Sequence, residues 1–513
     1  MCSALVSANA PIKDGWKSMA LPTHFDSLYI GGSWVKSVGG ESSAVINPAT
    51  EEVIGKAPVG TAADAEAAIA AARDAFDHGP WPKMAWRERA GVLQQFHDAL
   101  MTRKEEIVQL CVAEAGSIVP VASIMQFDMA MDGLQYYIHQ IERREFVIPS
   151  SVSAHTNWAT GGETLGSTVK VYEPLGVSVG ITAYNYPFFL NLAKLGPALA
   201  SGCTFILKPA PQTPLEALIL GDIASEVGFP PGVFSIVTGG ADVGEKLTTD
   251  PRVDQISFTG SDKIGAMIQA QAAPTLKRVT LELGGKSAMI VCEDADLEQA
   301  AFAGLINLTN QCGQGCVLQT RQLVHNAIKD QYIEMLKAMA GQVKLGNPAD
   351  PETGMGPLIS AAQRERVLAF IEQGKADGNT LVCGGTIPPG MDSGFFIEPT
   401  IFDCPNNSTT IAQEEIFGPV VCVIGFDTEE EAIAIANDSQ YGLSGGVFSQ
   451  DPGKAFRIGM KMRTGGVLIN GGGGRLNPSV PFGGYKRSGI GREYGEEGLN
   501  EYLEIKVIDF RAA

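Results

Sequence analysis

Cys316 ends the stretch NQCGQGC, residues 310–316, in which glycines stand close to the sulfur. A thiolate is a small, polarisable nucleophile that forms a covalent adduct and can leave again. Nearby glycines let the backbone approach a substrate, and they free an N–H group for a developing oxyanion. We therefore predict that Cys316 is a nucleophile, presented on a loop just after a helix over residues 296–309. A buried structural cysteine is the alternative, because free cysteines are often buried.

Two further polar residues stand where strands are expected to end. Asn185 follows the alternating run over residues 177–181, and its amide could donate to an oxyanion or cap a turn before Pro187. Glu282 lies between two leucines in LELGGKS, residues 281–287. An apolar setting should raise the pKa of this carboxyl group towards that of a useful general base. A paired structural carboxylate is the alternative role for Glu282.

Other residues could hold a dinucleotide. Glu415 could bind ribose hydroxyls and Phe417 could pack on a nicotinamide, although both also suit an ordinary loop. Gly240 and Gly244 open a helix after an expected strand, which would admit a pyrophosphate at the helix N-terminus. This spacing is not the GxGxxG fingerprint. Lys208, at another strand end, could place an ammonium group beside a ribose or phosphate, or could simply be solvated.

The elements that would position these residues alternate between strands and helices. Near the N-terminus, Thr61 is a good N-cap for an alanine-rich helix, and a long helical pattern covers residues 87–114. Strands are then expected at residues 177–181, 204–207, 233–237, 253–258 and 279–283, with helices between them. This alternation predicts a parallel sheet that is covered on both faces and binds ligands at the carboxyl ends of its strands.

The alternation restarts after Gly284, which predicts a second α/β domain. Its expected strands cover residues 286–292, 417–426 and 467–470. A last strand, residues 503–507, alternates strictly, and an exposed alternating edge strand risks aggregation unless it is paired. We expect it to pair with a strand near residues 169–172 and with another subunit. A final strand inside its own domain is the alternative.

Composition limits the classes of function. A chain of 513 residues should hold two or three domains, and its net charge of −19 argues against binding nucleic acid or an anionic membrane. Nine irregularly spaced cysteines suit reduced thiols in the cytoplasm, and the six histidines lack metal-ligand spacing. We predict no membrane span, no signal peptide and no metal, and we interpret residues 1–26 as a loose leader.

Seven ordered motifs give the chain a family resemblance. They are YNYP (184–187), LKP (207–209), FTGS (258–261), LELGGKS (281–287), GQGC (313–316), EIFGP (415–419) and PFGGYK (481–486). In these motifs the chain resembles the aldehyde dehydrogenase superfamily, of the NAD(P)-dependent hydrolytic type, from about Tyr29 to its end.

The resemblance implies three parts and a homodimer or homotetramer. A Rossmann-like domain that binds the nicotinamide cofactor would comprise residues 1–151 and 172–284. A second α/β domain, 285–487, would be catalytic. Residues 152–171 and 495–513 would form a β-strand oligomerisation arm.

The resemblance also implies a mechanism for oxidising an aldehyde to a carboxylic acid. Cys316 attacks the aldehyde, Asn185 and the Cys316 N–H hold the oxyanion, and hydride passes to NAD or NADP. Glu282 then activates water against the thioester, and Glu493 would help to relay protons. Residues implied in cofactor binding are Thr182, Ala183, Tyr184, Lys208, Gly240, Gly244, Phe258, Thr259, Gly260, Ser261, Leu283, Glu415 and Phe417.

The chain departs from the family pattern at a few positions. Gly315, Leu318 and Thr309 are unusual near the nucleophile and predict a roomier thiol environment. Pro211 replaces a glutamate of many NAD-preferring members, which leaves NADP possible. Ala193 stands where some relatives carry a bulky aromatic residue, so we expect a wide apolar tunnel and a bulky or hydrophobic aldehyde.

Other functions are also considered. A semialdehyde dehydrogenase that acylates coenzyme A is the nearest, but such enzymes often lack a carboxylate at the position of Glu282. A non-catalytic structural protein on this fold would need none of Cys316, Asn185 and Glu282. A thiol hydrolase should lack the cofactor-binding residues, and no histidine lies near Cys316 in sequence.

Overall fold

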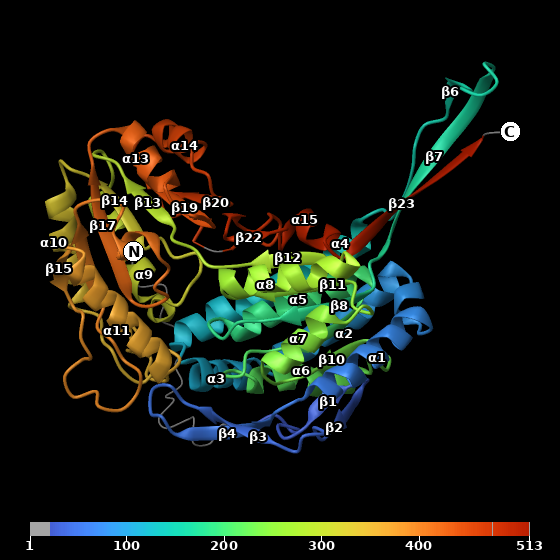
Figure 1. Ribbon diagram of the computed structural model, residues 1–513, viewed down its shortest axis with the longest axis horizontal. Coiled ribbons are helices and arrows are strands. Elements are labelled where there is room, and N and C mark those ends of the chain that lie inside the picture. The colour runs from blue at the N-terminus through green and yellow to red at the C-terminus, as the bar shows by residue number, and fades with distance from the viewer. Residues whose placement is uncertain (1–20, 475, 512–513) are drawn as a thin grey trace.

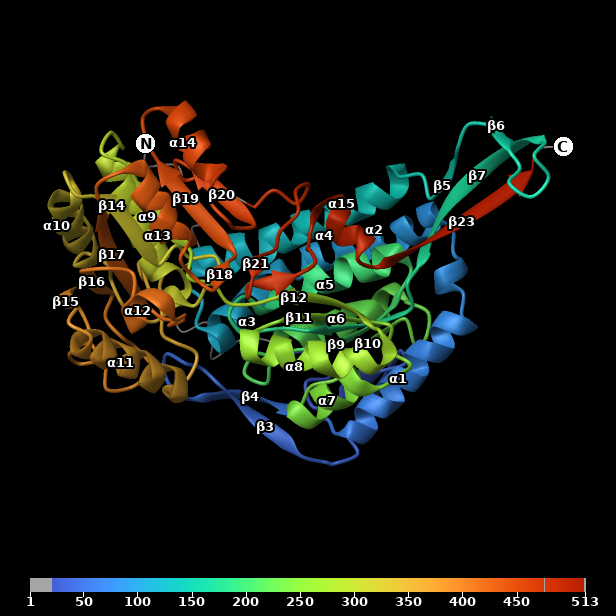
Figure 2. The ribbon, with the colours of Figure 1, turned by 45° about the horizontal axis from the view of Figure 1, so that its top comes forward.

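Two mostly parallel sheets form the framework of the computed structural model, which describes residues 21–474 and 476–511 (Figures 1 and 2). The strand order is β2-β1-β10-β9-β8-β11-β12-β22 in the first sheet and β15-β16-β17-β14-β13-β19-β20 in the second. The predicted α/β fold is therefore confirmed. The antiparallel pairings lie towards the edges of both sheets.

Buried parallel strands make up the centre of the first sheet. The strands of this sheet are β1 (Leu28–Ile30), β2 (Ser33–Val35), β8 (Val177–Ile181), β9 (Thr204–Lys208), β10 (Phe234–Ile236), β11 (Gln255–Thr259), β12 (Arg278–Glu282) and β22 (Gly489–Ile490). Every residue of β8, β9 and β11 is buried, as expected for a sheet that is covered on both faces. The predicted strands coincide with these elements to within a few residues.

Helices cover both faces of the first sheet. One side holds α5 (Pro187–Ser201) and α6 (Leu215–Val227), and beyond them α2 (Trp86–Thr102), α3 (Lys104–Ala115) and α4 (Met129–Arg143). The other side holds α1 (Ala62–Asp77), α7 (Ala241–Thr249) and α8 (Asp262–Ala272). Thr61 caps α1 as predicted, since its side chain accepts the N–H of Asp64.

The predicted single helix over residues 87–114 is wrong. Arg103, with φ −101° and ψ 11°, leaves helical geometry and separates α2 from α3. Its guanidinium bonds Glu106 at 2.6 and 2.8 Å, an interaction that periodicity alone does not reveal. The sequence also did not predict that Val121–Asp128 form a π-helix. Helices of this type are rare in proteins, and those that occur are often found at functional sites.

The second sheet has the same layered construction. Its strands are β13 (Ala288–Val291), β14 (Arg321–His325), β15 (Thr380–Cys383), β16 (Thr400–Cys404), β17 (Val420–Phe426), β19 (Ser444–Phe448) and β20 (Gly466–Ile469). Helices α9 (Leu297–Thr309) and α10 (Lys329–Ala340) pack on one face. Helices α11 (Ala361–Ala376), α12 (Thr410–Gln413), α13 (Glu429–Asn437) and α14 (Pro452–Gly459) pack on the other.

A narrow β-arm projects from the body of the molecule (Figure 1). It comprises β5 (Val147–Pro149), β6 (Ser153–Thr156), β7 (Glu163–Pro174) and β23 (Leu503–Arg511). Strand β23 pairs antiparallel with β7 along its whole length, which confirms the pairing predicted near residues 169–172. Side chains of β23 such as Ile505, Val507 and Phe510 are exposed.

Short elements connect these parts. They are the hairpin of β3 (Ser42–Ile46) and β4 (Val53–Pro58), the pair of β18 (Tyr441–Gly442) and β21 (Tyr485–Lys486), and α15 (Gly495–Asn500). In the part of the chain that the structure describes, no helix combines the length and apolar character needed to cross a bilayer. Most of the predicted leader, residues 1–20, lies outside the described residues.

Candidate active site

The loop that carries Cys316 follows α9, as predicted. A short 3₁₀ turn, Asn310–Gly313, intervenes, and Cys316 itself is partly buried before β14 begins. Gln311 and Cys312 adopt left-handed backbone angles, with φ of 49° and 54°. Left-handed geometry is unfavourable for residues other than glycine and persists only where surrounding contacts hold it. Strain of this kind is common at functional sites.

Side chains from distant elements hold this loop in place. The Asn185 amide donates to the carbonyl of Gln314 at 2.8 Å, and the Gln311 amide donates to the carbonyl of Ala115 at 3.0 Å. Asn185 lies in the loop between β8 and α5 and is 4% exposed. Its amide nitrogen carries a second N–H, which is available for an oxyanion. The structure thus brings Asn185 to the nucleophile loop.

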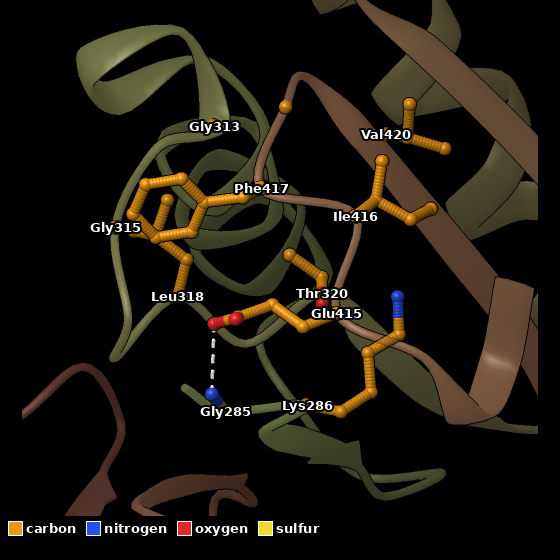
Figure 3. A pocket seen from close by; sticks show the side chains of 11 residues that line it. Gly285, Lys286, Gly313, Gly315, Leu318, Thr320, Glu415, Ile416, Phe417 and Val420 are labelled. Atoms are coloured by element: carbon orange, nitrogen blue, oxygen red, sulfur yellow. Dashed lines mark hydrogen bonds between the residues drawn. The ribbon is translucent and has the colours of Figure 1, made fainter. Parts of the chain in front are cut away.

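Two glycines allow three loops to meet around the nucleophile. A Cβ at Gly285 would lie 2.5 Å from the carbonyl oxygen of Cys316. A Cβ at Gly313 would lie 2.1 Å from the carbonyl oxygen of Gly418. Both distances are too short for any side chain, so only glycine permits the contact. Figure 3 shows Gly285, Gly313 and Gly315 around one pocket with Glu415 and Phe417.

Glu282, the last residue of β12, is 3% exposed, and neither of its carboxylate oxygens has a hydrogen-bond partner among the described residues. Burial raises its pKa well above the usual range, and the charge of Glu493 raises it further. The pKa shift predicted from the two flanking leucines is confirmed. An unpaired buried carboxyl group is the form expected of a general base and differs from a paired structural carboxylate.

Glu493 lies beside a residue that sequence reasoning missed. The Lys194 ammonium group contacts a Glu493 carboxylate oxygen at 2.5 Å and donates to the Ser257 hydroxyl at 3.1 Å. Lys194 is completely buried on α5. A lysine among the apolar residues of LNLAKLGP, residues 190–197, was the signal that could have found it.

The Cys316 thiol carries its proton at rest. Burial raises its pKa to about 12, and the negative charges of Glu282 and Glu415 act in the same direction. Thiolate formation therefore requires a proton acceptor in the pocket or a compensating positive charge.

Residues predicted to hold a nicotinamide come from both sheets and meet. The rings of Tyr184, after β8, and Phe417, before β17, lie edge to face with centroids 6.1 Å apart. Glu415 accepts the N–H of Gly285 at 2.8 Å (Figure 3). Phe417 has a left-handed φ of 59°, and its carbonyl accepts the Gln363 amide at 2.7 Å.

The dinucleotide residues of the first sheet are also in place. Gly240 begins α7 without any side-chain cap, so the N–H groups of this helix end are open to an anion. Lys208 is 6% exposed, and burial lowers its pKa to about 8, which rules out the solvated alternative. A Cβ at Gly244 would lie 3.8 Å from Lys208. An open helix end beside a buried ammonium group fits a pyrophosphate.

Some predicted cofactor residues have other uses. The side chains of Phe258 and Leu283 belong to a buried core, so only their backbones could reach a ligand. The Ser261 hydroxyl caps α8 by accepting the N–H of Ile264. Thr259 is buried with an unpartnered hydroxyl, while Gly260 packs against the Phe258 ring.

Comparisons with known proteins identify the family of this chain. Residues 34–508 match the sequence model of the aldehyde dehydrogenase family. A 3-succinoylsemialdehyde-pyridine dehydrogenase from a Pseudomonas species is 42% identical, over 94% of this chain and 98% of the relative. An aldehyde dehydrogenase of Mycobacterium tuberculosis, solved with NAD+, has a TM-score of 0.89 and 43% identity, covering 94% of this chain and 98% of the other.

Two further solved structures match as closely in shape. An aldehyde dehydrogenase C variant of Pseudomonas syringae, complexed with NAD+ and octanal, has a TM-score of 0.89 and 39% identity, covering 96% and 98% of the two chains. A betaine aldehyde dehydrogenase of Staphylococcus aureus, complexed with NAD+, has a TM-score of 0.90 and 37% identity, covering 95% of each chain.

The fold and the comparisons define an NAD-dependent oxidoreductase built on two α/β sheets. The chain belongs to the aldehyde dehydrogenase family. The predicted family and the predicted oxidation of an aldehyde to an acid are confirmed. The alternative of a non-catalytic structural protein is therefore set aside.

Proposed function

We propose that this enzyme oxidises an aldehyde to the free carboxylic acid with NAD+, and that Cys316 forms the covalent intermediate. The observation that carries this proposal is the meeting of Cys316, Asn185 and an unpaired, buried Glu282 where the two sheets adjoin. Bound NAD+ supplies the hydride acceptor. The assignment of NAD+ as the cofactor is supported by the open N-terminus of α7 beside Lys208 and by the NAD+ bound in three solved relatives.

The roles of the residues follow from their surroundings. The Cys316 sulfur bonds to the carbonyl carbon as its proton passes to water in the pocket, and the Asn185 amide and the Cys316 N–H donate to the oxygen. After oxidation at that carbon, Glu282 takes a proton from water as the water attacks the thioester, and the sulfur departs. Glu493, paired with Lys194, would carry the proton onward.

The cofactor contacts belong to the same proposal. Glu415 holds ribose hydroxyls and Phe417, with Tyr184, bounds the nicotinamide. Thr182, Ala183, Gly260 and Leu283 would contribute mainly through their backbones. Lys208 and Gly244 lie where the adenosine end and pyrophosphate would bind. Pro211 leaves NADP possible, so the two cofactors require direct comparison.

The substrate is proposed to be bulky or hydrophobic. The support is that Ala193 and Gly315 are small residues in buried positions, although Leu318 fills the space beside Gly315, where a Cβ would lie 2.8 Å from it. The Pseudomonas relative is named for a pyridine-containing semialdehyde, and the Pseudomonas syringae enzyme was solved with octanal. A kcat/KM for acetaldehyde markedly above those for octanal and aromatic aldehydes would reject this substrate class.

Three parts are proposed with the predicted limits. Residues 1–151 and 172–284 bind the cofactor, 285–487 are catalytic, and 152–171 with 495–513 form the arm. Exposed apolar residues on β23, at the edge of the arm sheet, support pairing with a second copy as a dimer or tetramer.

A cytoplasmic location is also proposed, and the unpaired state of the described cysteines supports it.

One assay tests the proposal. A panel of aldehydes is mixed with NAD+ or NADP+, and the absorbance of the reduced nicotinamide is followed. We expect reduction that depends on aldehyde and is absent from the Cys316→Ala variant. A parallel reaction with coenzyme A separates the acylating alternative. Formation of the acyl-CoA in place of the free acid would contradict the assigned role of Glu282.

A further inference from the structure

Two carboxylates are buried against each other, away from Cys316. Glu114, near the end of α3, and Glu216, in the first turn of α6, are both completely buried. The two carboxylate oxygens of Glu114 accept the N–H groups of Leu215 and Glu216, at 3.0 and 2.9 Å. Glu114 therefore caps the N-terminus of α6 from another helix.

The side chain of Glu216 extends this chain of hydrogen bonds towards helix α5. Both of its carboxylate oxygens accept the Asn191 amide, at 3.0 Å each. The Asn191 amide oxygen in turn accepts the Thr182 hydroxyl at 2.7 Å. Asn191 lies on α5 and is completely buried, so water cannot replace these bonds.

The chain of bonds connects two loops that leave neighbouring strands. Thr182 opens the loop after β8, which carries Tyr184 and Asn185. The helix capped by Glu114 follows the loop after β9, the strand that ends at Lys208. The backbone N–H of Thr182 also donates to the Lys208 carbonyl at 3.1 Å. The first loop holds residues assigned to the cofactor, and the second directly follows Lys208, which is also assigned to it.

Protonation makes the burial of these two carboxyl groups possible. Two adjacent buried carboxylates cannot both ionise cheaply. Burial raises the pKa of Glu114 to about 8, although two backbone N–H groups favour its charged form, and burial with the charge of Glu114 raises the pKa of Glu216 well above its ordinary value. Glu216 therefore holds its proton more tightly than Glu114 does, and glutamine is the closest mimic of its protonated form.

We propose that Glu114, Glu216 and Asn191 are positioning residues that lock the two cofactor loops together, and so set the affinity for NAD+. The proposal rests on the cofactor assignment of the proposed function. None of the three touches the reacting atoms. Their loss should weaken cofactor binding more than it slows the chemical step.

Calorimetric titration of NAD+ into the full-length protein tests this positioning role. We expect Glu216→Met and Asn191→Leu each to raise the Kd for NAD+ about tenfold or more, because buried groups lose their partners. Glu216→Gln should stay within about threefold, since its amide mimics the protonated acid. Glu114→Gln should resemble Glu216→Met, because the two oxygens of Glu114 accept two separate backbone N–H groups, whereas those of Glu216 share one amide nitrogen. In every variant kcat at saturating NAD+ should change less than about threefold.

Leu110→Ala is the matched control, a cavity-forming change at a buried residue of the same helix α3. It should lower Tm yet leave the Kd for NAD+ within about twofold of wild type, since it breaks none of these hydrogen bonds. Unchanged Kd in folded Asn191→Leu and Glu114→Gln would overturn the proposal, as would equal losses in Glu216→Gln and Glu216→Met. If Glu216→Met does not fold, the Kd values of Asn191→Leu and the two glutamine variants for NAD+ decide whether the proposal holds. Failure of wild type to bind NAD+ would refute the proposed function itself.

Discussion

The two sheets contribute to the site from opposite edges. In the first sheet, the candidate residues end strands or follow them, as Lys208 does for β9 and Glu282 for β12. In the second sheet they precede strands, as Cys316 does for β14 and Glu415 for β17. The site thus lies between the carboxyl edge of one sheet and the amino edge of the other.

This difference separates the nucleophile from the contacts to the pyrophosphate and from the general base. The carboxyl edge of the first sheet follows the general rule for ligands of open α/β sheets. The carboxyl edge of the second sheet instead carries ion pairs, such as Lys454 with Glu293 at 3.0 Å. The first sheet should therefore govern cofactor affinity and water activation, and the second should supply the nucleophile and close the pocket.

The largest expected effect comes from removing the nucleophile of the second sheet. Cys316→Ala should lower kcat by at least about 10⁴-fold, because covalent catalysis is lost. Its Kd for NAD+ should stay close to wild type, since the first-sheet contacts remain. Stopped-flow turnover and calorimetry measure the two quantities. If the Cys316→Ala variant lost NAD+ affinity together with turnover, the proposed division between the sheets would be wrong.

Removing the base of the first sheet should have a smaller and later effect. Glu282→Gln should slow steady turnover by about 10² to 10⁴-fold, the usual contribution of a general base. A first burst of reduced cofactor should survive, because hydride transfer precedes hydrolysis. Rapid mixing at the absorbance of the reduced nicotinamide reports the burst. Its disappearance would mean that Glu282 acts before hydride transfer, for example by deprotonating Cys316.

Asn185 bridges the two sheets, and Asn185→Ala should lower kcat by about 10² to 10³-fold through loss of an oxyanion donor. The loop of Cys316 also loses its bond to the Gln314 carbonyl. Asn185→Asp is the matched control, since it keeps the size but cannot donate. Equal turnover by Asn185→Asp and wild type would remove Asn185 from the oxyanion site.

The smallest effect concerns pH and the second-sheet carboxylate. Burial raises the pKa of Glu415 to about 7, so this group loses its charge as the pH falls through that value. The KM for NAD+ should rise about tenfold below pH 7, because a neutral acid accepts ribose hydroxyls weakly. Steady-state kinetics from pH 6 to 8.5 measure this change. If Glu415→Gln kept the same pH dependence, another group would be responsible.

The sequence predicted the groups that stand out locally. Cys316 lies among glycines and Glu282 lies between leucines, so nearby residues alone indicated a nucleophile and a carboxyl group of raised pKa. The strands were equally visible, because buried parallel strands have continuous apolar runs. The order of these strands along the chain then assigned each of them to the first or the second sheet.

Contacts between distant residues could not be predicted in this way. The pairing of Lys194 with Glu493 joins residues 299 positions apart. Nothing near Arg103 in sequence marks the break between α2 and α3. The left-handed angles at Gln311 and Cys312 exist only because Asn185 and other distant groups hold the loop. Such features depend on tertiary packing, which single-sequence patterns do not contain.

The most direct test of the central claim is the mass of the covalent intermediate. Glu282→Gln, mixed with NAD+ and an aldehyde that wild type oxidises, is quenched in acid and measured by intact-protein and peptide mass spectrometry. We predict one acyl group per chain on the peptide containing Cys316, and none in the double variant Cys316→Ala with Glu282→Gln. An acyl group on another residue, or its persistence in the double variant, would contradict the account.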